Sequence, residues 1–259
     1  QAGMKQSRLR CLDAKTGKLL WEAPFTGSPS WSRQAPPVVH KNLVIYMFGS
    51  GNYAAQGTDK AFLQKGEPVP DAEGRQVMSF IYGHKNPYYP GDNKPLIRAW
   101  DLETGEEVWQ QDFSQLGTGG NDSGLCLMDD TLYYSTFFGY AAKRRGEPGP
   151  RGVTAALDPT TGKVLWSTTE HYVTAGCTIS GRDGRLYVGG YNKPHAETND
   201  RYVWCLDARD GSLVWQSEPV KSSVNVITVG KEYLFSNASG GDGHVIDRQT
   251  GKILSRFNF

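Results

Sequence analysis

Short hydrophobic runs separated by polar turns recur along the whole chain, and one arrangement of them repeats. In its clearest copy, residues 205–215, a short apolar run precedes an aspartate, a glycine follows four positions later, and a second apolar run ends in tryptophan. Aspartate accepts hydrogen bonds from the backbone that follows it, and glycine adopts a positive φ at little steric cost. The arrangement predicts a β-hairpin whose tryptophan can reach a neighbouring sheet.

Five copies of this hairpin motif share the aspartate and the glycine, and four of them share the tryptophan. The motif residues are Asp13, Gly17, Trp21, Asp101, Gly105, Trp109, Asp158, Gly162, Trp166, Asp207, Gly211, Trp215, Asp247 and Gly251. The last copy departs from the pattern, because Ser255 replaces tryptophan and Val245 replaces the alanine or cysteine found two residues before the other aspartates. We therefore expect the last unit to pack less tightly at its outer edge.

The spacing of the motifs predicts an all-β fold. Asp207 and Asp247 are 40 residues apart, close to the ~40–45 residues of one four-stranded propeller blade. Two further apolar runs lie between successive motifs, so each unit has four strands and is typical of an antiparallel β-propeller blade. The predicted organisation is a single propeller segment with an opening hairpin at 1–22 and blades at 23–110, 111–167, 168–216 and 217–259.

The interval between Asp13 and Asp101 is longer, at 88 residues. We favour one blade with an insertion at about 50–94, in which residues 76–82 could form a strand of a small hairpin. Two blades of about 44 residues, one of them degenerate, remain the alternative.

The opening hairpin supplies only the two outer strands of a blade. We therefore expect an open arc of four full blades plus one hairpin, belonging to a larger propeller. Exposed sheet faces at the edges of such an arc are unfavourable, so further blades are expected on the same polypeptide.

Composition excludes several functions. The chain has 28 basic and 27 acidic residues, and this balance gives no electrostatic reason to expect nucleic acid or an anionic membrane as a partner. No apolar run approaches the ~18 residues of a membrane-spanning helix. The four cysteines (Cys11, Cys126, Cys177 and Cys205) form no CxxC pair and are expected as small buried residues in strands, with a disulfide between neighbouring units left open.

The pattern Ala/Cys-x-Asp-x-x-Thr-Gly-x-x-x-Trp resembles the PQQ-like propeller repeat. That repeat occurs in quinoprotein alcohol dehydrogenases and in non-catalytic relatives such as the outer-membrane barrel-assembly lipoprotein. The resemblance implies a ring of seven or eight blades and a periplasmic or extracellular location in bacteria. It is specific for the fold and leaves the function open.

The connections between the second and third strands of each blade are long or rich in glycine, at 50–94, 140–152, 191–201 and 238–243. The turns between the third and fourth strands are short in every unit. One face of the propeller is thus plain and the other elaborated, and long loops on a rigid scaffold are where binding usually occurs. The alternative is that these loops are neutral surface insertions.

The candidate partner-binding residues are polar or aromatic and are predicted on the elaborated face. They are Arg33, Gln34, Asn121, Asp122, Ser123, Thr174, Ser222, Ser223 and Asn225 near the starts of inner strands, and His84, Tyr88, Tyr89 and His195 in the long loops. They suit hydrogen bonding to a polar ligand or partner, although ordinary turn chemistry also explains each one singly. The five histidines have no spacing that metal sites use, so no metal is predicted.

An enzyme of this resemblance would stack the quinone PQQ between a tryptophan and a disulfide of adjacent cysteines. It would also hold Ca²⁺ with Glu, Asn and Asp and use an Asp as base. This chain has no adjacent cysteine pair, and no Glu lies on a predicted inner strand. We favour a non-catalytic binding or scaffold module for a protein, glycan or small polar ligand. The alternatives are part of a PQQ-dependent oxidoreductase, with PQQ and Ca²⁺ as cofactors, or an accessory propeller domain of a larger secreted enzyme.

Overall fold

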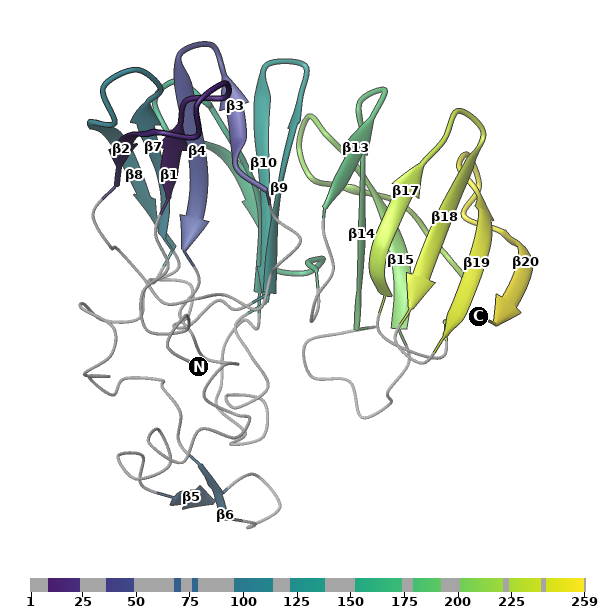
Figure 1. Cartoon of the computed structure of the whole chain (residues 1–259). Helices are drawn as coiled ribbons and strands as arrows, with labels where there is room; N and C mark the ends of the chain where they lie inside the picture. Colours follow the sequence, from purple (N-terminus) through teal and green to yellow (C-terminus); the bar gives the residue numbers. More distant parts are fainter. Residues whose placement is uncertain are drawn as a thin grey trace.

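Every regular element in the described part of the chain is a β-strand. The structure is a computed structural model and describes residues 9–23, 36–48, 68–70, 76–78, 96–113, 122–137, 152–173, 179–191, 201–220, 224–238 and 241–258. Within these ranges the strands form four four-stranded antiparallel sheets and two separate hairpins (Figure 1). The prediction of an all-β fold is confirmed.

Each four-stranded sheet is built from consecutive strands, each of which pairs with the next, as a blade requires. The first contains β3 (Val38–His40), β4 (Leu43–Phe48), β7 (Leu96–Asp101) and β8 (Glu107–Asp112). The second contains β9 (Asp122–Met128), β10 (Thr131–Phe137), β11 (Gly152–Leu157) and β12 (Val164–Thr168). The third contains β13 (Ser180–Arg182), β14 (Arg185–Tyr191), β15 (Arg201–Asp207) and β16 (Leu213–Gln216). The fourth contains β17 (Val224–Val229), β18 (Tyr233–Ala238), β19 (Asp242–Asp247) and β20 (Ile253–Asn258).

Two hairpins complete the described structure. β1 (Arg10–Leu12) and β2 (Leu19–Glu22) form the opening hairpin, which carries the first motif copy. β5 (Pro68–Pro70) and β6 (Gln76–Met78) pair with one another inside the long segment between β4 and β7, while β4 pairs directly with β7.

The sheets follow one another around a common axis and leave the ring open. Their first strands, β3, β9, β13 and β17, contact one another in chain order and therefore form the inner side of the arc. The opening hairpin lies at one edge of the arc and β17–β20 at the other (Figure 1). The predicted open arc of propeller blades is confirmed.

The motif aspartate closes the turn between the two outer strands. At Asp101, for example, the carboxylate Oδ1 accepts hydrogen bonds from the backbone N–H of Glu103 and Thr104, and the backbone carbonyl accepts one from Gly105. These bonds favour the charged carboxylate, so the pKa of Asp101 lies below its usual value, mainly because of the Thr104 N–H. The glycine has φ of +74°, a conformation that disfavours other residues.

Asp207 is held more firmly than the other motif aspartates. Its carboxylate accepts hydrogen bonds from the Arg209 and Arg185 guanidinium groups as well as from the Arg209 backbone N–H. The Arg209 guanidinium is the main reason that the pKa of Asp207 lies well below its usual range.

Each motif tryptophan reaches across to the turn of the next sheet. Its indole N–H donates a hydrogen bond to the carbonyl of the residue that follows the next motif aspartate. The four contacts are Trp21 to Leu102 at 2.9 Å, Trp109 to Pro159 at 3.1 Å, Trp166 to Ala208 at 3.0 Å and Trp215 to Arg248 at 3.1 Å. This repeated contact joins five successive units in one direction around the arc.

The glycine of each receiving turn lies directly beneath the incoming ring. A Cβ atom added at Gly105, Gly162, Gly211 or Gly251 would lie 2.4–2.7 Å from the nearest ring atom of the tryptophan from the preceding unit. The motif glycine therefore serves two purposes, because it permits the positive φ of the turn and leaves room for the ring.

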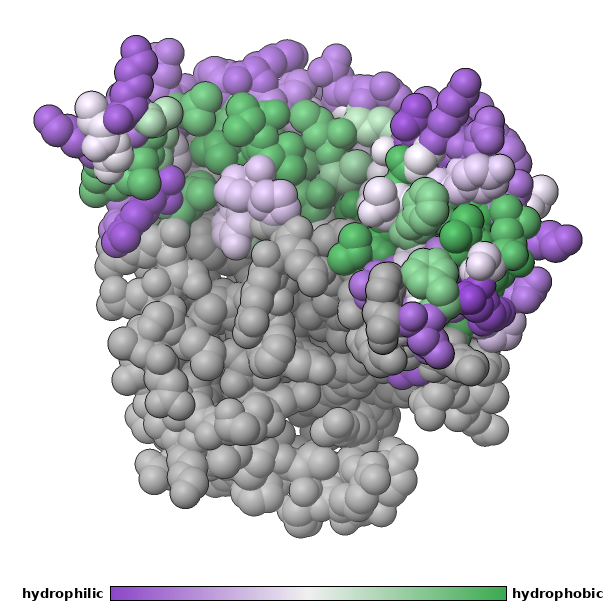
Figure 2. Space-filling model, turned by 45° about the vertical axis from the view of Figure 1, so that its right-hand side comes forward, coloured by the Kyte–Doolittle hydropathy of each residue, from purple (hydrophilic) through white to green (hydrophobic). Residues whose placement is uncertain are grey.

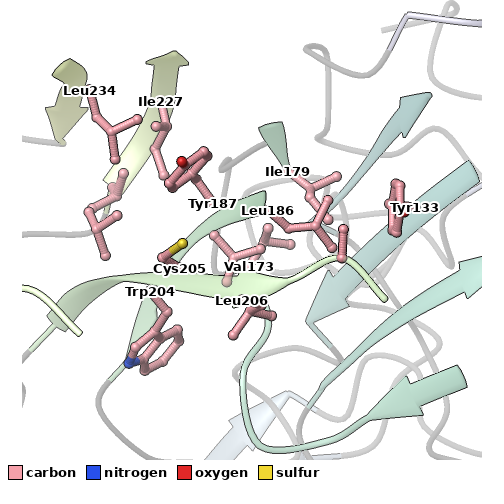
Figure 3. Packing of buried hydrophobic residues seen from close by; sticks show 14 of the residues in the cluster. Tyr133, Val173, Ile179, Leu186, Tyr187, Trp204, Cys205, Leu206, Ile227 and Leu234 are labelled. Carbon is pink, nitrogen blue, oxygen red and sulfur yellow. The ribbon is translucent and has the colours of Figure 1, made fainter. Parts of the chain in front are cut away.

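Buried apolar side chains fill the spaces between sheets. The largest described cluster lies between the second, third and fourth sheets and includes Tyr133, Tyr187 and Leu206 (Figure 3). A second cluster, with Ile45 and Tyr134, lies between the first and second sheets. A smaller one, with Trp100 and Trp21, joins the opening hairpin to the first sheet. The core is thus a series of layers between blades, as expected for a repeat architecture.

Three cysteines fall in the described part of the chain, and all three are free thiols in strands. Cys205 is buried, whereas Cys11 and Cys126 are only partly buried, so the expectation of full burial holds for one of the three. Burial raises the pKa of the Cys126 thiol to about 11 and that of Cys205 to about 12. Both are therefore protonated and unreactive at neutral pH. Cys177 lies outside the described residues.

The two roles of the motif glycine can be separated by substitution. Gly17 has a φ of +69°, close to the +72° of Gly162, but among the described residues no atom lies within 4 Å of a Cβ built at Gly17. We expect Gly17→Ala to lower the free energy of unfolding by about 1 kcal/mol through backbone strain alone. Gly162→Ala adds a clash with the Trp109 ring and should cost about 3 kcal/mol. Urea denaturation of both variants measures the difference, and equal costs would show that the ring contact does not constrain the turn.

Candidate binding face

The two ends of the sheets differ in the length of their connections. The turns that join β3–β4, β9–β10, β13–β14 and β17–β18, and all the Asp-to-Gly turns, are short and lie at one end, at the top of Figure 1. The connections β4–β7, β10–β11, β14–β15 and β18–β19 leave from the opposite end because the strands are antiparallel. We call this opposite end the loop face. Its framework is described, whereas most of its loops lie outside the described residues.

Most predicted site residues fall in those loops. Arg33, Gln34, His84, Tyr88, Tyr89, Asn121, Thr174, His195, Ser222 and Ser223 lie outside the described residues. The backbone of Asp122 and Ser123 begins β9, opposite Phe137 and Thr136 at the far end of β10. Asn225 follows Val224 at the start of β17, and Val224 pairs with Ala238 at the end of β18. The starts of these two inner strands are therefore at the loop face, and a binding role for all thirteen residues stays a prediction.

A relay of buried hydroxyl groups fixes the chain where it leaves the second sheet. The backbone N–H of Val173 donates to Ser135 Oγ at 2.9 Å. The Ser135 and Thr154 hydroxyls lie 2.7 Å apart, and Thr154 Oγ1 donates to the backbone carbonyl of His171 at 2.7 Å. Ser135 and Thr154 are completely buried. With Ser135 donating to Thr154, each hydroxyl both accepts and donates, so neither hydroxyl is left unsatisfied.

A similar arrangement secures the connection that follows the third sheet. Ser217 Oγ accepts a hydrogen bond from the Val203 backbone N–H at 3.0 Å and donates to the Glu218 carbonyl at 2.8 Å. The Val220 N–H donates to the Arg201 carbonyl at 2.8 Å. Between sheets, Ser180 Oγ donates to the Ile227 carbonyl at 2.7 Å and so links the inner strands β13 and β17. These contacts give the loop face a rigid base.

The two histidines near this base are held neutral. The His171 ring packs against Trp204 with their centroids 5.0 Å apart, and burial lowers the His171 pKa, opposed by Glu170. His244 is buried with its Nδ1 at 3.1 Å from Ser236 Oγ, and its pKa is lowered first by burial and then by the Arg256 charge. Both rings carry no charge at neutral pH; the His244 ring is part of the buried packing, whereas the His171 ring is partly exposed.

The framework does not supply the donor set that a calcium-bound quinone would need. Among the described residues, no three His, Cys, Asp or Glu side chains cluster as metal ligands would. The sequence holds no two adjacent cysteines, the feature on which the resemblance places the quinone. The described hydroxyls near the loop face, such as Ser135 and Thr154, are buried and hydrogen-bonded within the chain, so they hold the framework.

Comparison with known proteins identifies the family. A family described as outer membrane protein assembly factor BamB matches residues 92–256, which is more than half of the chain. The chain belongs to this family of PQQ-like propeller proteins. The family resemblance inferred from the hairpin motif is confirmed.

Individual relatives fall into two functional groups. The chain is 23% identical to the outer membrane protein assembly factor BamB of Moranella endobia, over 96% of its own length and 60% of that protein. It is 24% identical to the dehydrogenase subunit of a quinone alcohol dehydrogenase from Komagataeibacter europaeus, over 97% of its own length and 34% of that protein. The chain therefore spans less than two thirds of either relative.

Solved structures support the fold. A quinohemoprotein alcohol dehydrogenase, ADHIIG from Pseudomonas putida HK5, superimposes with a TM-score of 0.59 at 14% identity, covering 98% of this chain and 39% of that one. A europium-containing methanol dehydrogenase gives a TM-score of 0.56 at 13% identity, covering 98% and 49% of the two chains. In the described ranges, no helix has the length and apolar character needed to cross a membrane.

The hydroxyl relay can be tested by an isosteric substitution. Thr154→Val keeps the branched shape but leaves the His171 carbonyl and the Ser135 hydroxyl without their partner, so we expect a loss of about 1–3 kcal/mol in the free energy of unfolding. Thr131→Val is the matched control, because Thr131 is only partly buried and its hydrogen bond to the Asp129 carbonyl is long, at 3.4 Å, so its loss should cost less than about 0.5 kcal/mol. The measurement is urea denaturation, and equal effects would show that the relay does not hold the connection.

Proposed function

We propose that this protein is a non-catalytic scaffold that docks a protein partner on its loop face. The observation that carries the proposal is the asymmetry of the sheets. Every connection between second and third strands leaves from one end, while the other end carries only short turns. Variation in loop length confined to one side of a rigid scaffold is typical of a binding surface.

The buried hydrogen bonds beneath the loop face also support a docking function. The hydroxyl relay and the Ser217 contacts hold the bases of the connections in fixed positions, and a fixed base lowers the entropy lost when a loop engages a partner. Some relatives carry the name of an assembly factor for outer membrane proteins. By analogy we propose a protein partner and a periplasmic location, with a glycan or small polar ligand as the other candidate occupants.

A dehydrogenase role is the alternative raised by the second group of relatives. No described residue favours it, because the framework lacks the adjacent cysteines and the clustered metal ligands that the resemblance calls for.

We also propose that the arc is completed by further blades of the same polypeptide. Both edges of the arc expose side chains whose counterparts inside the arc are buried, and the chain spans only 60% of the Moranella relative. Blades with the same repeat would cover these edges at little cost, because each requires contact only with its neighbours.

The docking face can be mapped by placing a photo-crosslinking amino acid at single positions in cells of the encoding organism. We expect substitution at Tyr88 or His195, in the long loops, to yield a discrete crosslinked protein of the same mass from both positions. Lys15 and Lys163 are exposed residues of the Asp-to-Gly turns and serve as controls that should not yield it. The same product from both ends, or none from the loop positions, would contradict the proposal.

A further inference from the structure

The turn between the first two strands of the second sheet lacks a bond that holds this turn in the other three sheets. There, the N–H of the residue after the motif aspartate donates to the carbonyl of the turn, as Leu102 does to Asn42 at 2.7 Å. In the second sheet that residue is Pro159, which has no N–H. Asp129 and Asp130 form the turn with φ of +49° and +54°, a conformation that glycine adopts more easily. Their exposed carboxylates are what glycine would not provide.

The turns over the first and second sheets are acidic. They carry six carboxylates and two lysines, in residues 41–42, 101–106, 129–130 and 158–163. The corresponding turns over the third and fourth sheets carry five carboxylates and four cations, in residues 183–184, 207–212, 230–232 and 247–252. The net charges are therefore −4 and −1. We call the six carboxylates the acidic turn zone; they belong to Asp101, Glu103, Glu106, Asp129, Asp130 and Asp158. Figure 2 shows hydrophilic side chains along the top of the molecule, where the turn end lies.

Contacts between the turns make the acidic turn zone continuous. Asn42 Nδ2 donates to Asp101 Oδ2 at 3.0 Å, which joins the two turns of the first sheet. The pKa of Asp158 is lowered first by the Thr161 N–H and more weakly by the Lys41 charge, which acts from the first sheet on the second. Asp158 therefore stays charged, and the carboxylates of the two sheets form one surface.

A buried histidine faces this surface. The His40 side chain is only 5% exposed, and its Nδ1 lies 3.8 Å from Asp130 Oδ1, too far for a hydrogen bond. In the described part of the chain, neither ring nitrogen of His40 has a hydrogen-bond partner. The Asp130 side chain is 86% exposed, so a ligand can reach it from solvent. A carboxylate and a neutral imidazole both accept hydrogen bonds, and a buried polar group without a partner is unfavourable. The two atoms therefore point to a donor from outside the chain that serves both.

We propose that the acidic turn zone binds a basic segment of a protein partner, with one lysine or arginine side chain of that segment placed between Asp130 and His40. The cation donates to Asp130 Oδ1 and to His40 Nδ1, and both side-chain types have several donors for such a contact. The surrounding carboxylates attract the other basic residues of the segment. Anionic ligands such as nucleic acid or acidic lipid are repelled by the same charges.

This surface goes beyond the proposed loop-face function, because it lies at the opposite end of the sheets. A scaffold with both surfaces can hold two proteins at once. The motif aspartates in the zone keep their role in the turns, whereas Asp129 and Asp130 belong to no Asp-to-Gly turn and are available to a partner.

The test is the binding of fluorescein-labelled hexaarginine and hexalysine peptides, measured by fluorescence anisotropy with labelled hexaglutamate as the negative probe. We expect both basic peptides to bind, and the contact to weaken about tenfold between about 30 mM and about 300 mM salt because exposed charges are screened. Tighter binding of hexaarginine than of hexalysine would identify a guanidinium as the preferred cation, and the reverse an ammonium; either result agrees with the proposal.

Specificity for the site is tested by removing single charges. Asp130→Asn keeps a residue that tolerates a positive φ and should weaken binding about fivefold. Asp210→Asn is the matched control, because Asp210 is an exposed turn aspartate of the third sheet and its replacement changes the net charge equally. It should weaken binding less than about twofold.

The part played by the histidine is tested by His40→Phe, which keeps a flat ring and removes the acceptor nitrogen. We expect weaker binding from this variant alone, and no further loss when it is combined with Asp130→Asn, because both residues act on the same cation. Circular dichroism at the assay temperature checks that each variant is folded, and Asp130→Asn carries the test if His40→Phe is not.

Binding that Asp130→Asn leaves unchanged, or that Asp210→Asn weakens as much, would show a general attraction to negative charge and overturn the proposal. Zn²⁺ that binds tightly in calorimetry and displaces the peptides from the parent but not from Asp130→Asn would make a metal ion the occupant and also overturn it. These measurements concern the turn end alone. Their failure would leave the loop-face function standing, and failure of the crosslinking experiment would leave the acidic turn zone as a binding surface.

Discussion

The structure depends on one contact between neighbouring sheets, in which an indole N–H donates to the carbonyl of the next sheet's turn while the ring lies over that turn's glycine. It occurs four times, between 2.9 and 3.1 Å. The carbonyl that accepts the bond is positioned by the aspartate before it, whose carboxylate holds the turn from inside. Aspartate, glycine and tryptophan therefore form one unit although they belong to two different sheets.

This contact makes the two ends of the sheets differ in how much change they tolerate. At the turn end, the aspartate, the glycine and the backbone carbonyl are all committed to holding the arc together, so that end tolerates little change. At the loop face, the connections are secured below the surface by buried hydroxyls such as Ser135 and Thr154. The loops above them can then vary in length without disturbing the sheets, since loop length costs little in closure entropy. A scaffold whose turn end is committed to packing, and whose loops can vary in length at the other end, suits a docking function.

Much of the fold could be predicted because the hairpin signal is local. Asp101, Gly105 and Trp109 are close in sequence. The turn formed by the aspartate and glycine, and the reach of the tryptophan to a neighbouring sheet, can each be inferred from the residue type alone. The hydroxyl relay could not be predicted, because Ser135 and Thr154 lie in apolar runs that read as ordinary strands, and their partners at 171 and 173 come from a connection with no signal of its own. The exposure of Leu12 could not be predicted from the sequence either, because Leu206 has the same position in the same motif and is buried. The difference lies in the neighbouring sheet and not in the residue.

The most direct measurement of the central contact is hydrogen exchange at the indole N–H groups, followed by NMR. If the contact holds the arc together, the indole protons of Trp109, Trp166 and Trp215 should exchange only through the cooperative opening that also exposes the amides of β11 and β15, with the same free energy and the same dependence on denaturant. Exchange of these indole protons at the rate of an exposed indole, while the strand amides stay protected, would contradict the account.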